Sequence, residues 1–326
     1  MNSATNLAIQ STSEQRMHRA ATACFLILSC LLALAFWKPL MTLVSLGLSA
    51  APDASEYSQI AVSPLICLYL ILRKRKAVFA DSKISLLPGV AIMLAGVTVL
   101  LVAWLEQGRL GGHGYITGLM AAFVTLEIGT FFLFFGPRAF RRARFGLLTL
   151  ALMIPFPTWL LDRTISFLQQ GSAAVTAFLL NLTPMPFVRE GLVFHLPTHL
   201  NIFIAGECSG IRSSIALLIA SLVASDVFLR KGWSKLALNL VVMPLSLFKN
   251  GVRIATLSLL SVYVDRGFMF GDLHHKGGIV FYLIACAVLG VFLWFLWKLE
   301  RKTNFKEMGQ GPVSTTPFGK AEAQQL

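Results

Sequence analysis

Charged side chains are scarce in this sequence, and acidic ones are the scarcest. Only 13% of the 326 residues are charged, whereas a soluble domain has about a quarter. The 28 Lys and Arg outnumber the 15 Asp and Glu, but they occur in short clusters between long apolar stretches rather than along one polar face. With 56% hydrophobic residues and a mean hydropathy of +0.72, the composition excludes a soluble enzyme, a nucleic-acid-binding module and a disordered protein. It indicates an integral membrane protein.

Internal repeats, a glycine-rich phosphate loop and paired cysteines are also missing. Of the five cysteines, four lie within apolar stretches without the spacing of a zinc site or a redox pair: Cys24, Cys30, Cys67 and Cys286. We interpret these four as packing residues, and we expect neither a metal nor a cofactor. A transporter, a channel, a receptor and an intramembrane enzyme remain possible.

Eight apolar stretches approach the length of about 20 residues that a membrane-spanning helix needs. They are Thr22–Phe36, Tyr57–Leu72, Ile84–Leu105, Ile116–Phe135, Phe145–Leu161, Ile211–Leu229, Leu236–Val264 and Ile279–Trp297. The sequence therefore predicts an all-α polytopic bundle of about eight transmembrane helices. We divide the chain into a tail (1–20), a membrane domain (21–302, with its catalytic part at 145–298) and a disordered polar tail (303–326).

The basic residues predict the orientation of these helices. When loops are assigned alternately to the two sides, 19 of the 28 Lys and Arg fall on one side, which the positive-inside rule makes cytoplasmic. Both termini are then cytoplasmic, in the plasma membrane. The other nine basic residues are Lys38, Arg109, Arg163, Arg189, Arg212, Lys249, Arg253, Arg266 and Lys276, several of which lie inside or beside spans.

One apolar stretch, Ile165–Leu182, does not fit the alternation, because a further crossing would move the later basic loops outside. We expect a helix that lies in the outer interface or re-enters the membrane there. The following residues, Phe187–Ile204, are rich in Val, Phe and Ile and contain Gly191 and Pro197, which predicts short extended segments before the next span.

Three polar groups interrupt the apolar excess in the last third of the chain, where ionisable residues are costly and point to function. They are Cys208-Ser209-Gly210 at the start of a span, Asn250 to Arg253 within the next, and His274 to Gly278 before the last. At about 1.5 Å of rise per residue, Cys208, Arg253 and His274 lie about 32, 26 and 36 Å above the cytoplasmic ends of their helices. We therefore expect them at one level, near the outer surface.

These residue types suit nucleophilic catalysis. A thiol at a helix N-terminus near a guanidinium is in the kind of site that lowers a cysteine pKa, although the adjacent Glu207 opposes this. An imidazole can carry a proton, and an arginine can stabilise an oxyanion. Alternatively, Cys208 is a small buried hydrophobe and Arg253 a structural charge that extends to the interface.

The ordered motifs resemble those of the exosortase/archaeosortase family of membrane cysteine transpeptidases. Cys208-Ser209-Gly210, Asn250 to Arg253, and His274 to Gly278 with Phe281 beyond match its three motifs, and Tyr57-Ser58-Gln59 and Pro155-Phe156-Pro157 also resemble family features. The adjacent His275 is an alternative to His274, which we favour because Gly278 and Phe281 then keep the family spacing.

The resemblance implies a protein-sorting enzyme. Its substrates would be exported proteins that end in a motif such as Pro-Glu-Pro, a transmembrane helix and a basic cluster. Cys208 would form a thioester, Arg253 would stabilise the oxyanion and His274 would protonate the leaving amine, with Ser209, Gly210, Asn250 and Gly278 in support. Arg212, at i+4 from Cys208, would assist the thiol or bind substrate. A lipid or polysaccharide amine or hydroxyl would accept the acyl group, or water would hydrolyse it.

Two other functions remain open on the sequence. A transporter would show matching broken helices in two halves and polar residues near the midplane, whereas Glu127 is almost the only ionisable residue in the spans before Phe145. We interpret Glu127 as a neutral, hydrogen-bonded acid. A non-catalytic membrane component of polysaccharide export would need none of the three motifs. His113, His195 and His199 are interpreted as incidental residues of outer loops.

Overall fold

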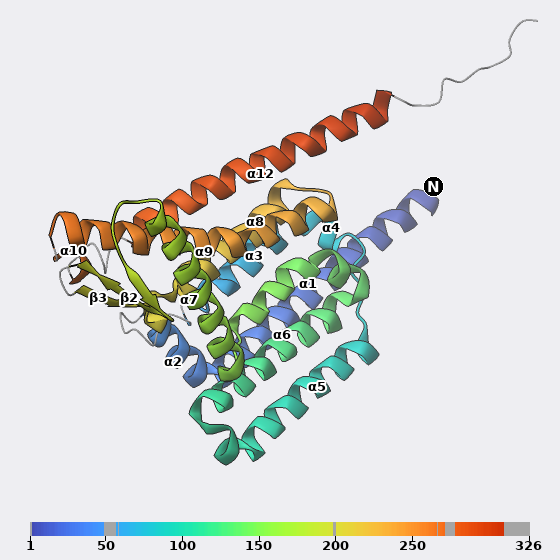
Figure 1. Ribbon diagram of the computed structural model, residues 1–326. Coiled ribbons are helices and arrows are strands. Elements are labelled where there is room, and N and C mark those ends of the chain that lie inside the picture. The colour runs from blue at the N-terminus through green and yellow to red at the C-terminus, as the bar shows by residue number, and fades with distance from the viewer. Residues whose placement is uncertain are drawn as a thin grey trace, which may run out of the picture.

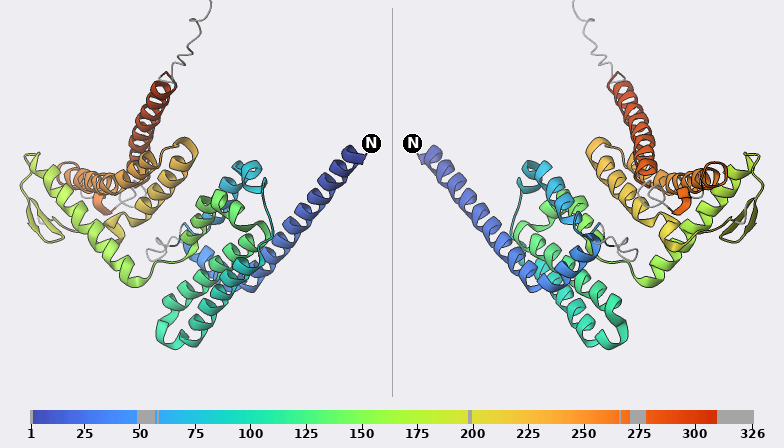
Figure 2. Two further views of the ribbon diagram at one scale, coloured as in Figure 1. Left: turned by 90° about the vertical axis from the view of Figure 1, so that its right-hand side faces the viewer. Right: turned by 90° about the vertical axis from the view of Figure 1, so that its left-hand side faces the viewer.

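The computed structural model describes residues 2–48, 57, 59–197, 200–265, 267–270 and 278–309. They form a helical protein with one small sheet, and Figure 2 shows two helical bodies that diverge from a short connection. The connection is the segment between Met153 and Thr158, and each body has its own buried hydrophobic clusters.

The described residues of the N-terminal half form six α-helices and a 3-10 helix (Figure 1). They are α1 (Asn2–Ala35), α2 (Trp37–Leu48), α3 (Ser63–Arg73), α4 (Arg75–Phe79), α5 (Leu86–Leu105), α6 (Gln107–Leu148) and η2 (Thr149–Met153). Helices α5 and α6 pack very closely through glycines. A Cβ atom added to Gly89 would lie 2.5 Å from the Leu133 Cα, and one added to Gly129 would lie 2.8 Å from the Met93 side chain. Small residues permit this approach between helices in a membrane.

Helix α6 is interrupted at Gly136, where the chain turns back. Gly136 has a φ of 73°, and a Cβ there would collide with the carbonyl of Lys83, so a residue without a side chain is required. A straight helix from Met120 to Met153 would be about 50 Å long, yet both residues belong to the same buried cluster. The fifth span predicted at Phe145–Leu161 is therefore wrong, because the returning segment ends at Met153 and α7 begins at Thr158.

In the C-terminal half, the part of the chain that the structure describes forms five α-helices, a short 3-10 helix and a sheet. In order they are α7 (Thr158–Asn181), β1 (Val188–Glu190), β2 (Val193–Leu196), β3 (Leu200–Phe203), η4 (Gly206–Ser209), α8 (Ile211–Phe228), α9 (Gly232–Tyr263), α10 (Gly267–Phe270) and α12 (Gly278–Gly309). The predicted helix at Ile165–Leu182 is confirmed as α7, which begins seven residues earlier. It packs on α9 where a Cβ on Gly251 would lie 2.5 Å from the Val175 side chain.

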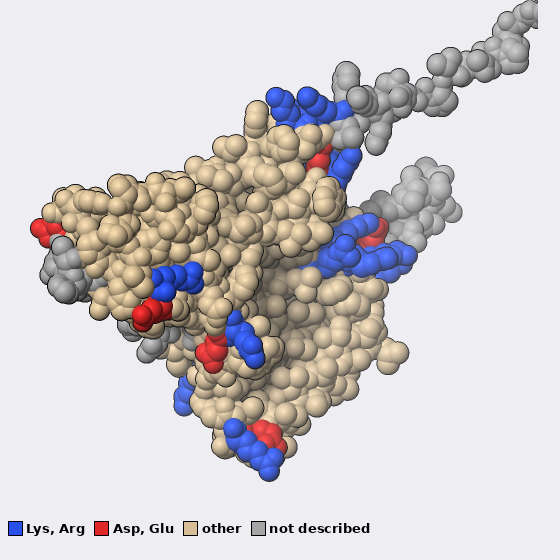
Figure 3. Space-filling model, viewed as in Figure 1, with Lys and Arg blue, Asp and Glu red and all other residues tan. Residues whose placement is uncertain are grey.

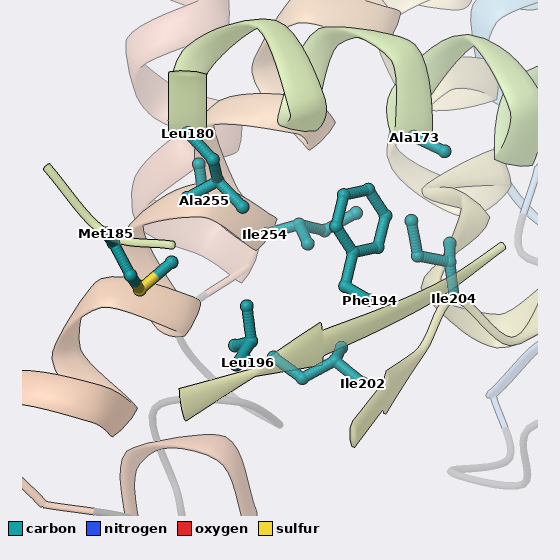
Figure 4. Packing of buried hydrophobic residues seen from close by; sticks show 9 residues of the cluster. All are labelled: Ala173, Leu180, Met185, Phe194, Leu196, Ile202, Ile204, Ile254 and Ala255. Carbon is teal, nitrogen blue, oxygen red and sulfur yellow. The ribbon is translucent and has the colours of Figure 1, made fainter. Parts of the chain in front are cut away.

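The predicted extended segments form an antiparallel sheet in the order β1-β2-β3. Figure 4 shows one face of the sheet packed against α7 and α9, with the Phe194 ring directed into the middle of the cluster. Phe194 is fully buried, and Ile202 and Ile204 pack beside it. Since Ile204 lies just before η4, this cluster fixes where the following turn begins.

Among the described residues, six helices are long and apolar enough to span a membrane, and α3 is a shorter apolar helix, so the predicted count of about eight is not established. At the C-terminal end, α12 continues to Gly309, so residues 303–309 are helical rather than disordered. At the N-terminal end, the predicted tail is helical from Asn2. In Figure 3 the largest groups of Lys and Arg lie toward the right, where Figure 1 shows the N-terminal end of α1 and the far end of α12.

Ionic contacts connect the two halves at this basic end. The Lys74 ammonium lies 2.6 Å from Asp226, whose side chain is 5% exposed, and Lys235 approaches the other carboxylate oxygen at 3.2 Å. The Arg73 guanidinium donates a hydrogen bond to the Val227 carbonyl at 2.8 Å. These contacts hold the ends of α3 and α8 together.

Candidate active site

The Cys-Ser-Gly motif forms a tight turn rather than the first turn of an α-helix. Cys208 lies in η4 and its side chain is half-buried, and Gly210 follows in the left-handed conformation with a φ of 76°. Helix α8 begins only at Ile211, whose N–H donates to the Ser209 hydroxyl at 3.4 Å. A residue with a side chain is strained at Gly210, so the glycine of the motif is explained by its backbone geometry.

This turn changes the position of Arg212. Because Gly210 separates η4 from α8, Cys208 and Arg212 do not share a continuous helix, so the expected i,i+4 spacing does not apply, and the role of Arg212 stays a prediction. Arg212 is exposed in the first turn of α8.

Asn250 of α9 is hydrogen-bonded to the cysteine turn (Cys208–Gly210). Its side chain is 1% exposed, and its amide group donates to the backbone carbonyl of Cys208 at 2.8 Å and to the Ser172 hydroxyl at 3.0 Å. A Cβ on Gly210 would lie 3.1 Å from the Asn250 Oδ1. The asparagine thus ties the cysteine turn to both α7 and α9, and the glycine allows the amide to come this close.

Arg253 lies about one turn further along α9 and is half-buried. Arg253 and Cys208 line the same small cavity of about 30 Å³, and the two side chains interact electrostatically. The other walls are Ile202, Phe203, Ile204, Ile254 and Leu257. A thiol and a guanidinium therefore face one space with otherwise apolar walls, where electrostatic interactions are stronger than in water.

The predicted histidines, His274 and His275, lie outside the described residues. Gly278 is described and is the first residue of α12, which packs against α8 and α9. The start of α12 follows directly after the segment that carries both histidines.

Lys249 directly precedes Asn250, but it lies outside the Asn250 to Arg253 motif and was not predicted to belong to the site. It is 7% exposed, and its ammonium donates a hydrogen bond to the Ser213 hydroxyl. Ser213 in turn donates to the Gly210 carbonyl at 2.9 Å. The sequence signal for Lys249 was its charge inside a predicted span. In the structure, Ser213 links the Lys249 ammonium to the cysteine turn.

Tyr57 and Phe156, from the two further segments of the family resemblance, both contact the His113 ring. His113 lies in α6 rather than in a loop, and its Nε2 is 2.8 Å from the Phe156 carbonyl. Because a carbonyl only accepts, Nε2 carries the proton, and Nδ1 accepts from the Tyr57 hydroxyl at 3.1 Å. The predicted loop position of His113 is therefore wrong, and the histidine joins Tyr57 to the segment that connects the two halves.

Glu127 accepts a hydrogen bond from the Ser29 hydroxyl at 2.8 Å, which agrees with the prediction of a hydrogen-bonded carboxyl. His195 lies on the exposed part of β2, hydrogen-bonded to Asn201 at 2.9 Å, and His199 lies outside the described residues. Within the described ranges, no three His, Cys, Asp or Glu side chains are grouped so that they could hold a metal ion.

Comparison with known proteins places these residues in context. The family model described as transmembrane exosortase matches residues 52–291, a range that includes all three polar motifs. No curated protein and no solved structure matches the chain.

Proposed function

Because the chain belongs to the transmembrane exosortase family, we propose that it is a membrane-embedded cysteine transpeptidase that cleaves C-terminal sorting signals from exported proteins. The observation that carries the proposal is the cavity shared by Cys208 and Arg253. Its substrates are exported proteins that end in a short motif of the Pro-Glu-Pro kind, an apolar helix and a basic cluster. Nucleic acid has no part in the reaction.

The reaction begins with the Cys208 thiolate. It attacks the scissile carbonyl carbon and forms a C–S bond, and the carbonyl oxygen becomes an oxyanion that the Arg253 guanidinium stabilises. Collapse of this intermediate breaks the C–N bond, and His274 donates a proton to the departing amine, with His275 as the alternative donor. The product of this step is a thioester between the substrate and Cys208.

The second step releases the product. An amine or hydroxyl group of a membrane lipid or polysaccharide attacks the thioester carbon and loses its proton to the histidine, and the thiolate leaves. If water attacks instead, the enzyme is a simple protease. Asn250 and Gly210 position the nucleophile, since the asparagine amide holds the Cys208 carbonyl at 2.8 Å.

The site lies at the outer surface of the plasma membrane, and both termini are cytoplasmic. This orientation is supported by the basic groups at the end where α1 begins and α12 ends, since cytoplasmic loops are enriched in Lys and Arg. Reporter fusions at residue 2 and after Gly309 test it, and an external location of either fusion would contradict it.

The central experiment is Cys208→Ala in cells that express an exported reporter ending in Pro-Glu-Pro, an apolar helix and an Arg-rich tail. We expect full-length reporter to accumulate, as it also should with Arg253→Ala and with the double change His274→Ala and His275→Ala. Cys30→Ala is the matched control, because Cys30 is an exposed cysteine on α1. Normal processing by the Cys208→Ala variant would refute the proposal.

A further inference from the structure

A long groove runs between the two halves of the protein, apart from the small cavity at Cys208. It has a volume of about 510 Å³ and is almost entirely apolar. One wall is a face of α3 and of the turn before it, and the other is a face of α8. Gln59 and Tyr69 are among the residues on the first side, and the second side extends along α8 from Ile215 to Phe228.

The α8 wall has the surface that suits a packed helix. Ala216, Ala220 and Ala224 recur at every fourth position and form a stripe of small side chains along the groove. Such a stripe lets the backbone of a neighbouring helix approach closely inside a membrane. From Ile215 to Phe228 the wall is about 20 Å long, which is about two thirds of the hydrocarbon thickness.

One buried polar group lies at the end of this apolar lining. Gln59 is 3% exposed, and its Oε1 accepts no hydrogen bond from any described residue. An amide oxygen left unsatisfied in such a place is energetically costly. A donor from a bound molecule would remove this cost, and the acyl chain of a lipid has no donor to offer.

The groove begins on α8 about two turns after the Cys208 turn. Its α8 wall begins at Ile215, and the same helix starts at Ile211, directly after the Cys208 turn. At the opposite end, the contacts of Arg73 and Lys74 with the end of α8 close the groove. A helix lying in the groove would therefore point one end toward Cys208.

We infer that this groove binds the apolar transmembrane helix of the substrate and delivers the adjoining scissile bond to Cys208. The inference rests on the proposed function and assigns its substrate-binding surface. The helix packs its small side chains against the Ala216, Ala220 and Ala224 stripe, and a hydroxyl or amide N–H from it bonds to Gln59.

Photocrosslinking tests the surface directly. The full-length Cys208→Ala protein, in native membranes with the same reporter, carries the photoreactive amino acid p-benzoylphenylalanine in place of Ala220. The matched control carries it in place of Leu218, an exposed residue on another face of α8. We expect the reporter helix to crosslink at position 220 and at least tenfold less at position 218. Equal yields, or only phospholipid adducts at position 220, would overturn the inference.

A steric variant supplies the second measurement. Ala220→Trp fills the groove, and we expect it to slow reporter processing about tenfold, as overpacking of a tight interface does. Ala95→Trp, on an exposed position of α5, should process the reporter as the unmodified protein does. A wild-type rate of reporter processing by the Ala220→Trp variant would refute the inference that the groove binds the substrate helix. If the enzyme processes the reporter but position 220 gives no crosslink, the groove inference alone fails. If position 220 crosslinks the reporter but the unmodified enzyme never cleaves it, the proposed function fails.

Discussion

Asn250 offers the sharpest test of how the site is built, because one amide group donates to both the cysteine turn and α7. Asn250→Ala removes its hydrogen bonds to the Cys208 carbonyl and the Ser172 hydroxyl. Each bond contributes about 1 kcal/mol, so the two together contribute about 2 kcal/mol.

The bond to the Cys208 carbonyl holds the cysteine turn in place, so its loss should appear mainly in the rate of cleavage. If its contribution of about 1 kcal/mol is felt at the thiol, processing falls about fivefold. The assay is the rate of reporter cleavage by purified enzyme per folded molecule, with the folded fraction taken from size-exclusion chromatography and thermal unfolding.

Asn239→Ala is the matched control on the same helix. The Asn239 amide accepts from Ser221 at 2.6 Å and donates to the Lys235 carbonyl at 2.8 Å, near the basic end of the bundle. The control should lower thermal stability by a similar amount without changing the rate per folded molecule. If the two variants cleave the reporter equally fast per folded molecule, Asn250 does not position Cys208.

Three further changes probe neighbouring parts of the protein. Gly210→Ala introduces a side chain at a φ of 76° and 3.1 Å from the Asn250 Oδ1, so we expect a loss of about 1–2 kcal/mol in unfolding free energy, and an unchanged thermal midpoint would contradict this. Lys249→Met replaces a buried ammonium by an apolar chain of similar length, and a thermal midpoint equal to or above the wild type is expected; a decrease of several degrees would show that the ammonium stabilises the fold. Gln59→Leu removes an unsatisfied buried oxygen and should stabilise the free protein by about 1 kcal/mol in thermal unfolding while it weakens reporter crosslinking at position 220; destabilisation would refute the assignment of Gln59 as a group awaiting a donor.

The meeting of Cys208 and Arg253 could be predicted from the sequence, because hydrophobic spans and a fixed rise per residue place each group at a calculable depth. The depth does not specify which face of a helix a residue occupies. The contacts of Asn250 with Cys208 and of Lys249 with Ser213 depend on how α8 and α9 rotate against each other, and that rotation is set by packing between segments distant in sequence.

The wrong prediction of a fifth span at Phe145–Leu161 has a different cause. Apolar residues continue across the break between η2 and α7, so hydropathy alone cannot show that the returning segment ends at Met153. Pro155 and Pro157 were the available signal, since the residue before a proline is biased away from the helical conformation. Arg212 was misplaced for a related reason: helical spacing was applied across Gly210, whose left-handed conformation ends the relationship.

The glycine contacts between α5 and α6 also bear on the order in which the protein is made. They join residues that are close in the sequence, such as Gly89 with Leu133, so this pair can form soon after α6 leaves the ribosome. The cysteine turn (Cys208–Gly210) forms later. Its hydrogen bonds require Ser172, Cys208 and Asn250 together, so it cannot form until α9 has been synthesised. Under the proposed function, the N-terminal half is thus available as a preformed partner before the Cys208 thiol has been positioned, and an incomplete chain in the membrane lacks the means to cleave its neighbours.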